Sequence, residues 1–374
     1  MSKPLIEVFK ALPDPRQGNG IRHKLDEILT IAILAIICEC TQFTEMEVYG
    51  KENEDWLRTF LKLENGIPSH DTFGDVFALL APEIIEKHFM EWVEGIREKI
   101  SGEIIAVDGK TICGSKNIAN KKKAIHVVSA WAANNRLVLG EVATDKKSNE
   151  ITAIPELLRM LSIKGCIITI DAMGTQKEIV KTVIEQGADY VLPVKENHPT
   201  LHTDLELFFL FEDNHDYAKT TEKAHGRIEV RECFVSNDVD WLPNRGDWAG
   251  LSGIGKIVSY RENLSTGKKE TSVQYIIYSD ANMTASQVLD AKRSHWGVEN
   301  SLHWVLDVTF GEDQSRMRLG NAAKNVSAMR HMAVNLLNNE KTYKASVNLK
   351  RKRATFSRQY LLKLIGVGNN TNLS

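Results

Sequence analysis

The chain has 374 residues, of which 43% are apolar and 26% are charged, so it can bury one or two hydrophobic cores and is not a disordered protein. Its 47 lysines and arginines nearly balance 49 aspartates and glutamates, and any basic surface must therefore come from local segregation of charge. The most apolar stretch, residues 28–38, is too short for a membrane span, and the five cysteines form no CxxC pair. With no signal-peptide pattern at the N-terminus, these features predict a cytoplasmic protein with reduced thiols and no membrane partner.

The first hundred residues are predicted to be helical. Apolar side chains recur at helical spacing over residues 25–36, 56–61 and 84–96. Pro82 suits the first turn of the last of these helices. We therefore expect a helical N-terminal domain over residues 1–100.

From Glu103 the apolar pattern changes to that of short strands. Three strands separated by polar turns are followed by a helix, a buried strand, a second helix and another strand. Strands that alternate with helices predict parallel pairing within an α/β sheet. The expected strands are 104–107, 125–131, 137–142, 166–170 and 190–194, and the expected helices are 151–161 and 177–185.

The rest of the chain divides into a strand-like segment and a helical one. Residues from about 200 to 280 are predicted to form a β-rich insertion, because Gly- and Asn-containing turns separate short apolar runs. We assign residues 101–340 to one domain and residues 341–374 to a basic helical tail. The candidate strands of the insertion are 229–235, 255–260 and 272–278, and the helices expected after it are 285–308, 322–337 and 355–364.

Two basic runs interrupt the even distribution of charge. They are Lys121-Lys122-Lys123 and Lys350-Arg351-Lys352-Arg353. Each run is either part of a basic binding surface or an ordinary solvated loop.

Two acidic residues each follow an apolar strand. Asp108 lies in IIAVDGK and Asp171 lies in CIITIDAMG. Because open α/β sheets bind ligands at the carboxyl ends of their strands, the two acids are expected to share a crevice. Each also has a purely structural interpretation, since Asp-Gly is a common hairpin turn and an Asp before a helix is a common N-cap.

A third acid, Glu299, lies on the helix expected over residues 285–308. His295, Glu299 and His303 are four residues apart and share one stripe of that helix, whereas Trp296 marks an apolar side. Composition alone favours a solvated glutamate and surface or core histidines.

The three carboxylates would need a cation if they converge. Two like charges about 4 Å apart repel by roughly 4 kcal/mol at an effective dielectric near 20. Oxygen ligands select Mg²⁺ or Mn²⁺, and two such ions about 3.5 to 4 Å apart suit phosphoryl transfer on DNA. A convergent site would therefore bind two divalent ions through Asp108, Asp171 and Glu299.

The order of these elements and motifs resembles the DDE transposases, whose catalytic domain has a ribonuclease H-like fold. More closely, the chain is similar over nearly its whole length to the H-repeat-associated transposases of bacterial insertion sequences. The matching segments are LPDPR (12–16), IPSHDTF (67–73), AVDGKT (106–111), SNEITAIPELL (148–158), TIDAMGTQ (169–176), YVLPVKENHPTL (190–201), HGRIEVR (225–231), HWGVENSLHWVLDVTFGED (295–313) and KRKRA (350–354).

This resemblance implies both a fold and a site. The fold class is α/β, with a ribonuclease H-like mixed sheet flanked by helices, a β-rich insertion and a helical N-terminal domain. The catalytic and metal-binding residues would be Asp108, Asp171 and Glu299, with Mg²⁺ or Mn²⁺ as the cofactor.

The surroundings of the glutamate differ from the wider branch of these transposases. That branch often has a Tyr, an Arg and a Lys at the positions of Lys292, His295 and Leu306. The changes leave open how the second DNA strand is cut, because the residues that usually contact phosphate are replaced.

Six residues are candidates for contacts to DNA. Lys195 follows a predicted strand, and the arginines in HGRIEVR suit bidentate contacts to phosphate. The alternatives are an ordinary lysine at a strand end and a strand with exposed charges. The candidates are Lys195, Arg227, Arg231, Arg293, His295 and His303.

The resemblance implies metal-dependent cleavage at transposon ends, followed by attack of the freed 3′-hydroxyl on target DNA. The expected partners are double-stranded DNA and a second copy of the chain, because two transposon ends must be held together. Two alternatives remain: a nuclease that cuts DNA without joining it, and an inactive DNA-binding relic of a mobile element.

Overall fold

A computed structural model describes residues 3–18, 21–116, 123–144, 150–212, 215–224 and 226–367. Three sequence features fall partly outside these residues, and what we predict for those parts is untested. They are the lysine run 121–123, the beginning of the 148–158 motif and His225 of HGRIEVR.

Helices form the first hundred residues, as predicted. The most apolar of them, α2 (Leu25–Ile37), is buried over nearly its whole length, because almost every position is aliphatic. The other helices of this part of the chain are α1 (Leu5–Lys10), α3 (Phe43–Glu52), α4 (Glu54–Leu57), α5 (His70–Leu79) and α6 (Pro82–Ile96).

A nine-stranded mixed sheet follows, in the order β3-β2-β1-β4-β5-β9-β8-β7-β6. Strands β1, β4 and β5 are parallel neighbours, and the remaining pairs are antiparallel. The predicted α/β class is therefore confirmed. The strands are β1 (Ile104–Ile112), β2 (Ile125–Ala132), β3 (Leu137–Thr144), β4 (Ile167–Ile170), β5 (Asp189–Val194), β6 (Asp216–Ala224), β7 (Arg227–Ser236), β8 (Gly253–Asn263) and β9 (Lys269–Tyr278).

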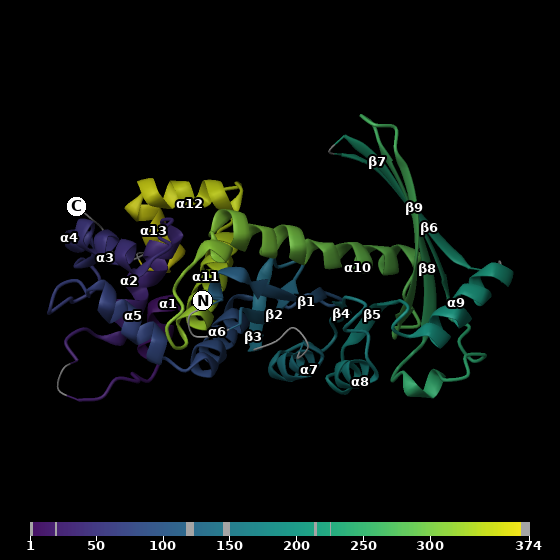
Figure 1. The fold of residues 1–374 in the computed structure, drawn as a ribbon, viewed down its shortest axis with the longest axis horizontal. Helices are drawn as coiled ribbons and strands as arrows, with labels where there is room; N and C mark the ends of the chain where they lie inside the picture. Colours follow the sequence, from purple (N-terminus) through teal and green to yellow (C-terminus); the bar gives the residue numbers. More distant parts are fainter. Residues whose placement is uncertain are drawn as a thin grey trace.

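Helices cover both faces of the sheet (Figure 1). On one face, α7 (Glu150–Met160) packs on β2 and β3, and α8 (Lys177–Glu185) packs on β5. On the other face, α10 (Ala285–Val298) crosses β1, β4 and β5 and continues over the insertion strands. This crossing brings the helix that leads to Glu299 over β1, which contains Asp108, and over β4, which leads to Asp171.

The segment predicted as a β-rich insertion begins with a helix, α9 (Pro199–Phe211), which the strand-like interpretation missed. Pro199 stands at the start of that helix, and Leu205 and Phe209 are buried at helical spacing. The structure also adds β6 to the three predicted strands. The insertion strands extend the main sheet, because β9 pairs with β5.

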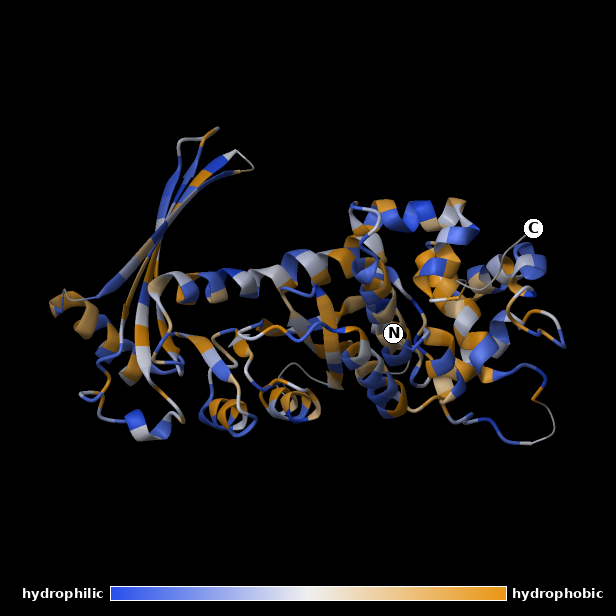
Figure 2. Ribbon diagram, turned by 180° about the vertical axis from the view of Figure 1, so that it is seen from behind, coloured by the Kyte–Doolittle hydropathy of each residue, from blue (hydrophilic) through white to orange (hydrophobic). Residues whose placement is uncertain are grey.

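The far ends of the insertion strands form an arm that rises from the body of the molecule (Figure 1). We define the arm as residues 219–224, 227–231, 258–263 and 269–273. It is mostly hydrophilic, in contrast to the apolar helices of the N-terminal region (Figure 2). An arm of this kind gains little from burial of its own side chains and suits contact with a polar partner.

The C-terminal helices pack back onto the N-terminal ones. They are α11 (Ala322–Asn339), α12 (Val347–Phe356) and α13 (Arg358–Leu364). One hydrophobic core contains Leu5 of α1, Ile105 of β1 and Leu361 of α13. The N-terminal helices, the sheet and the C-terminal helices therefore share a core. The domain boundaries near residues 100 and 340 stay predictions.

Half of the basic run 350–353 is buried, so the run is neither a solvated loop nor a fully available basic surface. Lys350 donates to the carbonyls of Leu337 and Glu340 at 2.7 and 2.6 Å. Arg351 donates to the carbonyl of Ile36 at 2.8 Å, at the end of α2. These cations satisfy helix-end carbonyls that have no partner within their own helices.

No described helix is long and apolar enough to cross a membrane.

Candidate active site

Asp108 directly follows the last residue of β1 that pairs with β4. Val107 and Ile170 are the last registered pair of these parallel strands, so Asp108 and Asp171 follow at the same level of the sheet. Strand β1 continues to Ile112 and pairs Asp108 with Ser129 of β2. The hairpin-turn interpretation of Asp108 is therefore wrong, and so is the expectation that the strand ends at this residue.

Hydrogen bonds to the backbone orient both aspartates. Asp108 Oδ1 accepts from the N–H of Gly109 at 2.9 Å, and Asp171 Oδ1 accepts from the N–H of Gly174 at 2.8 Å. Helix α8 begins only at Lys177, so Asp171 closes a turn and is not the N-cap of that helix. In both residues the second carboxylate oxygen stays available for another ligand.

Gly109 is needed beside Asp108 because no side chain fits at this position. A Cβ there would collide with the side chains of Glu150 and His126, which lie 3.3 Å apart behind the strand. The close approach of these groups explains the Asp-Gly pair as a packing requirement.

Glu299 follows α10 directly, in a π-helical turn that spans Glu299–His303. Its side chain is 55% exposed, whereas that of His303 is only 7% exposed. His303 Nδ1 lies 3.6 Å from Asp108 Oδ2 and 3.6 Å from Glu299 Oε2. The helix thus brings the predicted glutamate to the first aspartate, and a histidine with it.

Asp108, Glu299 and His303 form a group that could hold a metal ion. Each offers one ligand atom, and these atoms lie within 4.8 Å of one another. Asp171 is not part of that group, although its charge acts on Asp108. Burial, followed by the charges of Glu299 and Asp171, raises the pKa of Asp108 to about 7. Crowded carboxylates of this kind fit a divalent cation, which would favour their ionised forms.

Lys292 is close enough to Asp171 for the two charges to interact, and it was not among the predicted site residues. Burial and the charge of Lys195 lower the pKa of Lys292 to about 8, while Asp171 acts in the opposite direction. The signal that could have found Lys292 is its spacing of seven residues from Glu299, which places both on one helix face. Lys195 is exposed just beyond β5, as expected for a residue that meets a ligand.

The two other positions at which the wider branch differs are buried. His295 is 9% exposed, and its Nδ1 lies 3.3 Å from the hydroxyl of Thr169 on β4. Burial and the neighbouring charge of Lys292 lower the pKa of His295 to about 3, so its ring is neutral. Leu306 is 1% exposed and packs in the core. We therefore leave His295 and His303 out of the proposed DNA contacts.

Family models match most of the chain. The model described as "Transposase DDE domain" matches residues 100–336, and one described as "DDE_Tnp_1-associated" matches residues 6–93. The chain belongs to the DDE transposase family. The matched DDE domain contains Asp108, Asp171 and Glu299.

Two relatives with similar sequences come from Escherichia coli. The chain is 40% identical to the "H repeat-associated putative transposase YhhI" of strain K12 over 97% of this chain and 98% of that protein. It is 41% identical to "Putative transposase YncI" of strain O157:H7 over 96% and 94% of the two chains. A solved structure, the synaptic complex of piggyBac transposase with hairpin DNA, aligns with a TM-score of 0.37 at 13% identity over 98% of this chain and 81% of that chain.

The predicted arginines of the DDE domain meet on the arm. Arg231 on β7 donates to Glu222 of β6 at 3.0 Å, and its Nη2 lies 2.8 Å from Glu229. Arg293 of α10 also pairs with Glu222. The carboxylates hold these guanidinium groups in place at the base of the arm.

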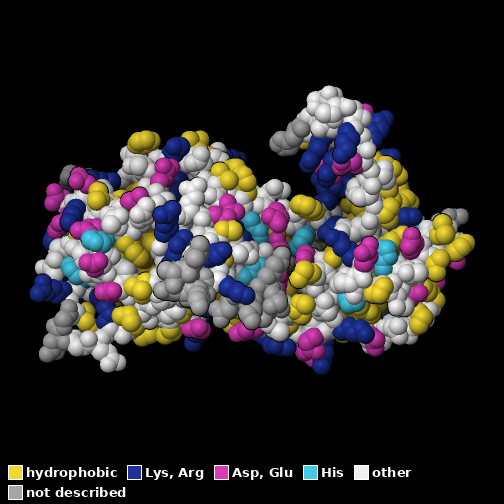
Figure 3. All heavy atoms as spheres, viewed as in Figure 1, with side chains coloured by type: hydrophobic (Ala, Val, Ile, Leu, Met, Phe, Trp, Pro, Cys, Tyr) yellow, Lys and Arg dark blue, Asp and Glu magenta, His cyan; other side chains and the backbone are white. Residues whose placement is uncertain are grey.

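Two further arginines extend the cluster outward. Arg227, which was predicted, is 44% exposed and lies 3.9 Å from Glu229. Arg261 on β8 is 47% exposed and pairs with the same carboxylate at 3.1 Å, and sequence reasoning missed it. Basic side chains gather on this part of the arm (Figure 3). The pairing of β7 with β8 brings Arg227 and Arg261 close together, and no pattern in the sequence predicts that pairing.

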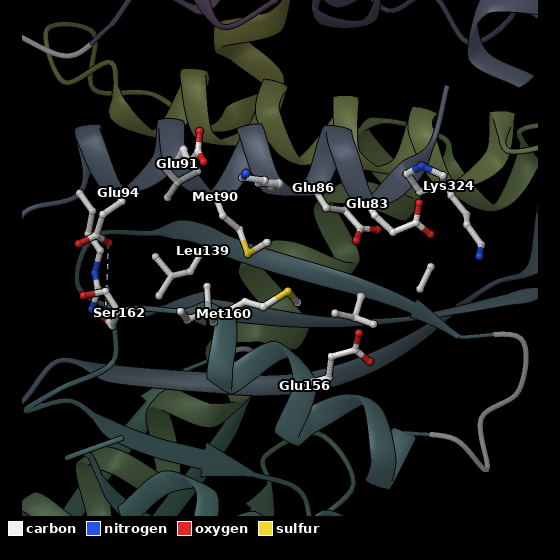
Figure 4. Close-up of a pocket in the computed structure, with 17 residues that line it drawn as sticks. Glu83, Glu86, Met90, Glu91, Glu94, Leu139, Glu156, Met160, Ser162 and Lys324 are labelled. Atoms are coloured by element: carbon white, nitrogen blue, oxygen red, sulfur yellow. Dashed lines mark hydrogen bonds and ion pairs between the residues drawn. The ribbon is translucent and has the colours of Figure 1, made fainter. Parts of the chain in front are cut away.

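A cavity of about 860 Å³ lies away from these residues, between α6, β3, α7 and α11, and none of the predicted site residues lines it. Glu83 and Glu86 point into it from α6, and Glu156 points into it from α7 (Figure 4). Burial, with the charges of Glu141, Glu83 and Glu156, raises the pKa of Glu86 to about 8, and Lys324 offsets part of the effect.

Glu86 should make the stability of the protein depend on pH. As pH rises from the ordinary value of 4.5 to about 8, the unfolded chain loses the Glu86 proton before the folded chain does. Stability is therefore lost over this range, and Glu86→Gln should reduce the loss by about 1–3 kcal/mol. Urea unfolding at pH 5 and pH 8 measures the difference. Exposed Glu91 of the same helix is the control, because Glu91→Gln should leave the loss unchanged; an equal loss in Glu86→Gln and the native protein would contradict the prediction.

Proposed function

We propose that this chain is the transposase of a bacterial insertion sequence, which cleaves phosphodiesters at the transposon ends and joins the freed 3′-hydroxyl to target DNA. The observation that carries the proposal is the meeting of Glu299 with Asp108, at a point where the charge of Asp171 also acts. These residues come from three separate segments of the matched DDE domain.

The proposed cofactor is a pair of Mg²⁺ or Mn²⁺ ions, which Asp108, Asp171 and Glu299 would hold. Bound ions would supply activation of the attacking oxygen and stabilisation of the leaving oxygen. Carboxylate oxygens are the donors that both metals accept. Burial raises the pKa of Asp108 most, and the charges of Glu299 and Asp171 add a repulsion that such ions would relieve.

The remaining residues of the site would bind and orient DNA. Lys195 and Lys292 add positive charge beside Asp171, where a phosphate of the cleaved strand would lie. Arg227 and Arg231 of the arm, together with Arg293 of α10, would hold the duplex further out through phosphate contacts. We also propose a homodimer on DNA, because the reaction engages two transposon ends.

A joining assay tests this function. The full-length protein is incubated with a pre-cut duplex from the flank of its own element and with a supercoiled plasmid, in Mg²⁺ or Mn²⁺. Covalent joining of the 3′-end to the plasmid is expected. Cutting of an uncut end without any joining would favour a nuclease, and the absence of both reactions would favour an inactive DNA-binding protein.

Arg227 should contribute to DNA binding through charge alone. Arg227→Gln is expected to weaken binding of end DNA and of unrelated DNA alike, and to reduce the slope of log K against log salt by about one. Fluorescence anisotropy across a salt series measures both effects. Arg159→Gln is a matched control, because Arg159 is 52% exposed and also lies 3.9 Å from a glutamate, but on α7. Equal slopes for both variants would contradict the role of the arm.

A further inference from the structure

His303 occupies a position that its hydrogen bonds do not explain. Its side chain is 93% buried, and its Nε2 has no hydrogen-bond partner among the described residues. Its Nδ1 faces Asp108 and Glu299 at 3.6 Å each, which is too long for a hydrogen bond. Burial of an imidazole without such bonds is costly, so the position indicates a further bonding partner.

The local helix geometry supports this interpretation. One π-helical turn begins at Glu299 and ends at His303, and a second one follows at Val305–Thr309. Such turns are rare and frequently occur at functional sites. The spacing of four residues keeps both side chains on the face that meets Asp108.

The distances also suit one ion between the three groups. His303 Nδ1 lies 3.6 Å from each of the two carboxylate oxygens. If two such donors each lie about 2.1 Å from one ion, the angle between them at the ion is roughly 115–120°. All three ligand atoms lie within 4.8 Å of one another. An ion at their centre would therefore need only small movements of exposed Glu299.

We propose that His303 is a nitrogen ligand of one active-site ion, together with Asp108 and Glu299, and that it makes this position prefer Mn²⁺ to Mg²⁺. The inference rests on the proposed function and deepens it. Imidazole binds transition metals well, whereas Mg²⁺ favours oxygen donors. Asp171, which lies outside the group, would serve the second ion.

Pulsed electron paramagnetic resonance on Mn²⁺ tests the nitrogen ligand directly. The full-length protein, alone and with end DNA, should show coupling of Mn²⁺ to a bound imidazole nitrogen. The coupling should disappear in His303→Gln and persist in His295→Gln. His295 is a matched control because it is also buried and lies on α10, directly before the π-helical turn of His303. Labelling the native protein with ¹⁵N-histidine tests the same contact without a substitution. The coupling of Mn²⁺ to the imidazole should then change from the ¹⁴N to the ¹⁵N pattern.

Metal affinities supply the second readout. The ratio of the Mg²⁺ to the Mn²⁺ dissociation constant should fall by about 10-fold or more in His303→Gln, because an oxygen donor replaces the imidazole. Mn²⁺ that binds to the native protein without a nitrogen signal would overturn the role of His303 and leave the proposed function intact. Failure of the native protein to bind Mn²⁺ with or without DNA would overturn both.

Discussion

Asp108→Asn should abolish cleavage and joining of transposon ends while the protein stays folded and still binds DNA. Asn keeps the oxygen that accepts from Gly109 but lacks the charge that a divalent ion requires. We expect a loss of more than about 100-fold, because even residues that only support a metal ligand contribute about 10–100-fold. The rate of joining of a pre-cut end measures the effect.

The same substitution should stabilise the protein when no metal is present. The pKa of Asp108 is raised from 3.8 to about 7, so the folded state loses stability relative to the unfolded chain as pH rises through this range. Asn avoids this loss, and the free energy of unfolding at pH 8 in EDTA should rise by about 1–3 kcal/mol. Greater stability together with lost activity separates a catalytic effect from unfolding.

Asp290→Asn is the control for both measurements. Asp290 is an exposed carboxylate on α10, the helix that leads to Glu299. Its substitution should change neither joining nor stability measurably. Full activity of Asp108→Asn would reject Asp108 as a metal ligand and would leave the DDE domain without its proposed chemistry.

The two aspartates could be predicted from local sequence because their placement depends on strands that short apolar runs define. Val107 and Ile170 end the shared part of two buried parallel strands, and such strands read as continuous apolar runs. Glu299 has no comparable local signal, since an exposed glutamate on a helix is common. Only the motif around it predicted its role, and the crossing of α10 over the sheet now supplies the physical reason.

The errors of prediction come from contacts between distant segments. Strand β6 is polar and largely exposed on both faces, so no alternation of apolar residues marks it; its pairing with β7 defines it. Arg351 is buried because carbonyls at the end of α2, more than 300 residues earlier, need donors. The run of four basic residues therefore could not predict that Arg351 is buried.

The predicted position of His303 is confirmed, but its proposed role has changed. Its spacing from Glu299 predicted that both would share a helix face, and the structure places them so. Its role as a DNA contact depended on exposure, which sequence does not give. Burial against Asp108 makes a metal ligand the better proposal.

Lys110→Met should lower the free energy of unfolding by about 3–5 kcal/mol, because it removes a buried cation from two buried or half-buried carboxylates. Lys110 lies two residues after Asp108 on β1, and its Nζ lies 2.6 Å from Asp307 and 2.7 Å from Glu312. Glu312 is only 1% exposed. Burial alone would lower the pKa of Lys110, but Glu312 and Asp307 outweigh it and raise the pKa.

The pairing of Lys110 with Asp307 also connects the strand of Asp108 to the helix of Glu299, so the joining rate should fall with stability. Urea unfolding and the joining assay measure the two effects on one preparation. Lys99→Met is the control, because Lys99 pairs with Glu94 at 2.9 Å but is 74% exposed; exposed pairs contribute about 0–1 kcal/mol. Equal effects of the two substitutions would mean that Lys110 does not hold the strand of Asp108 and the helix of Glu299 together.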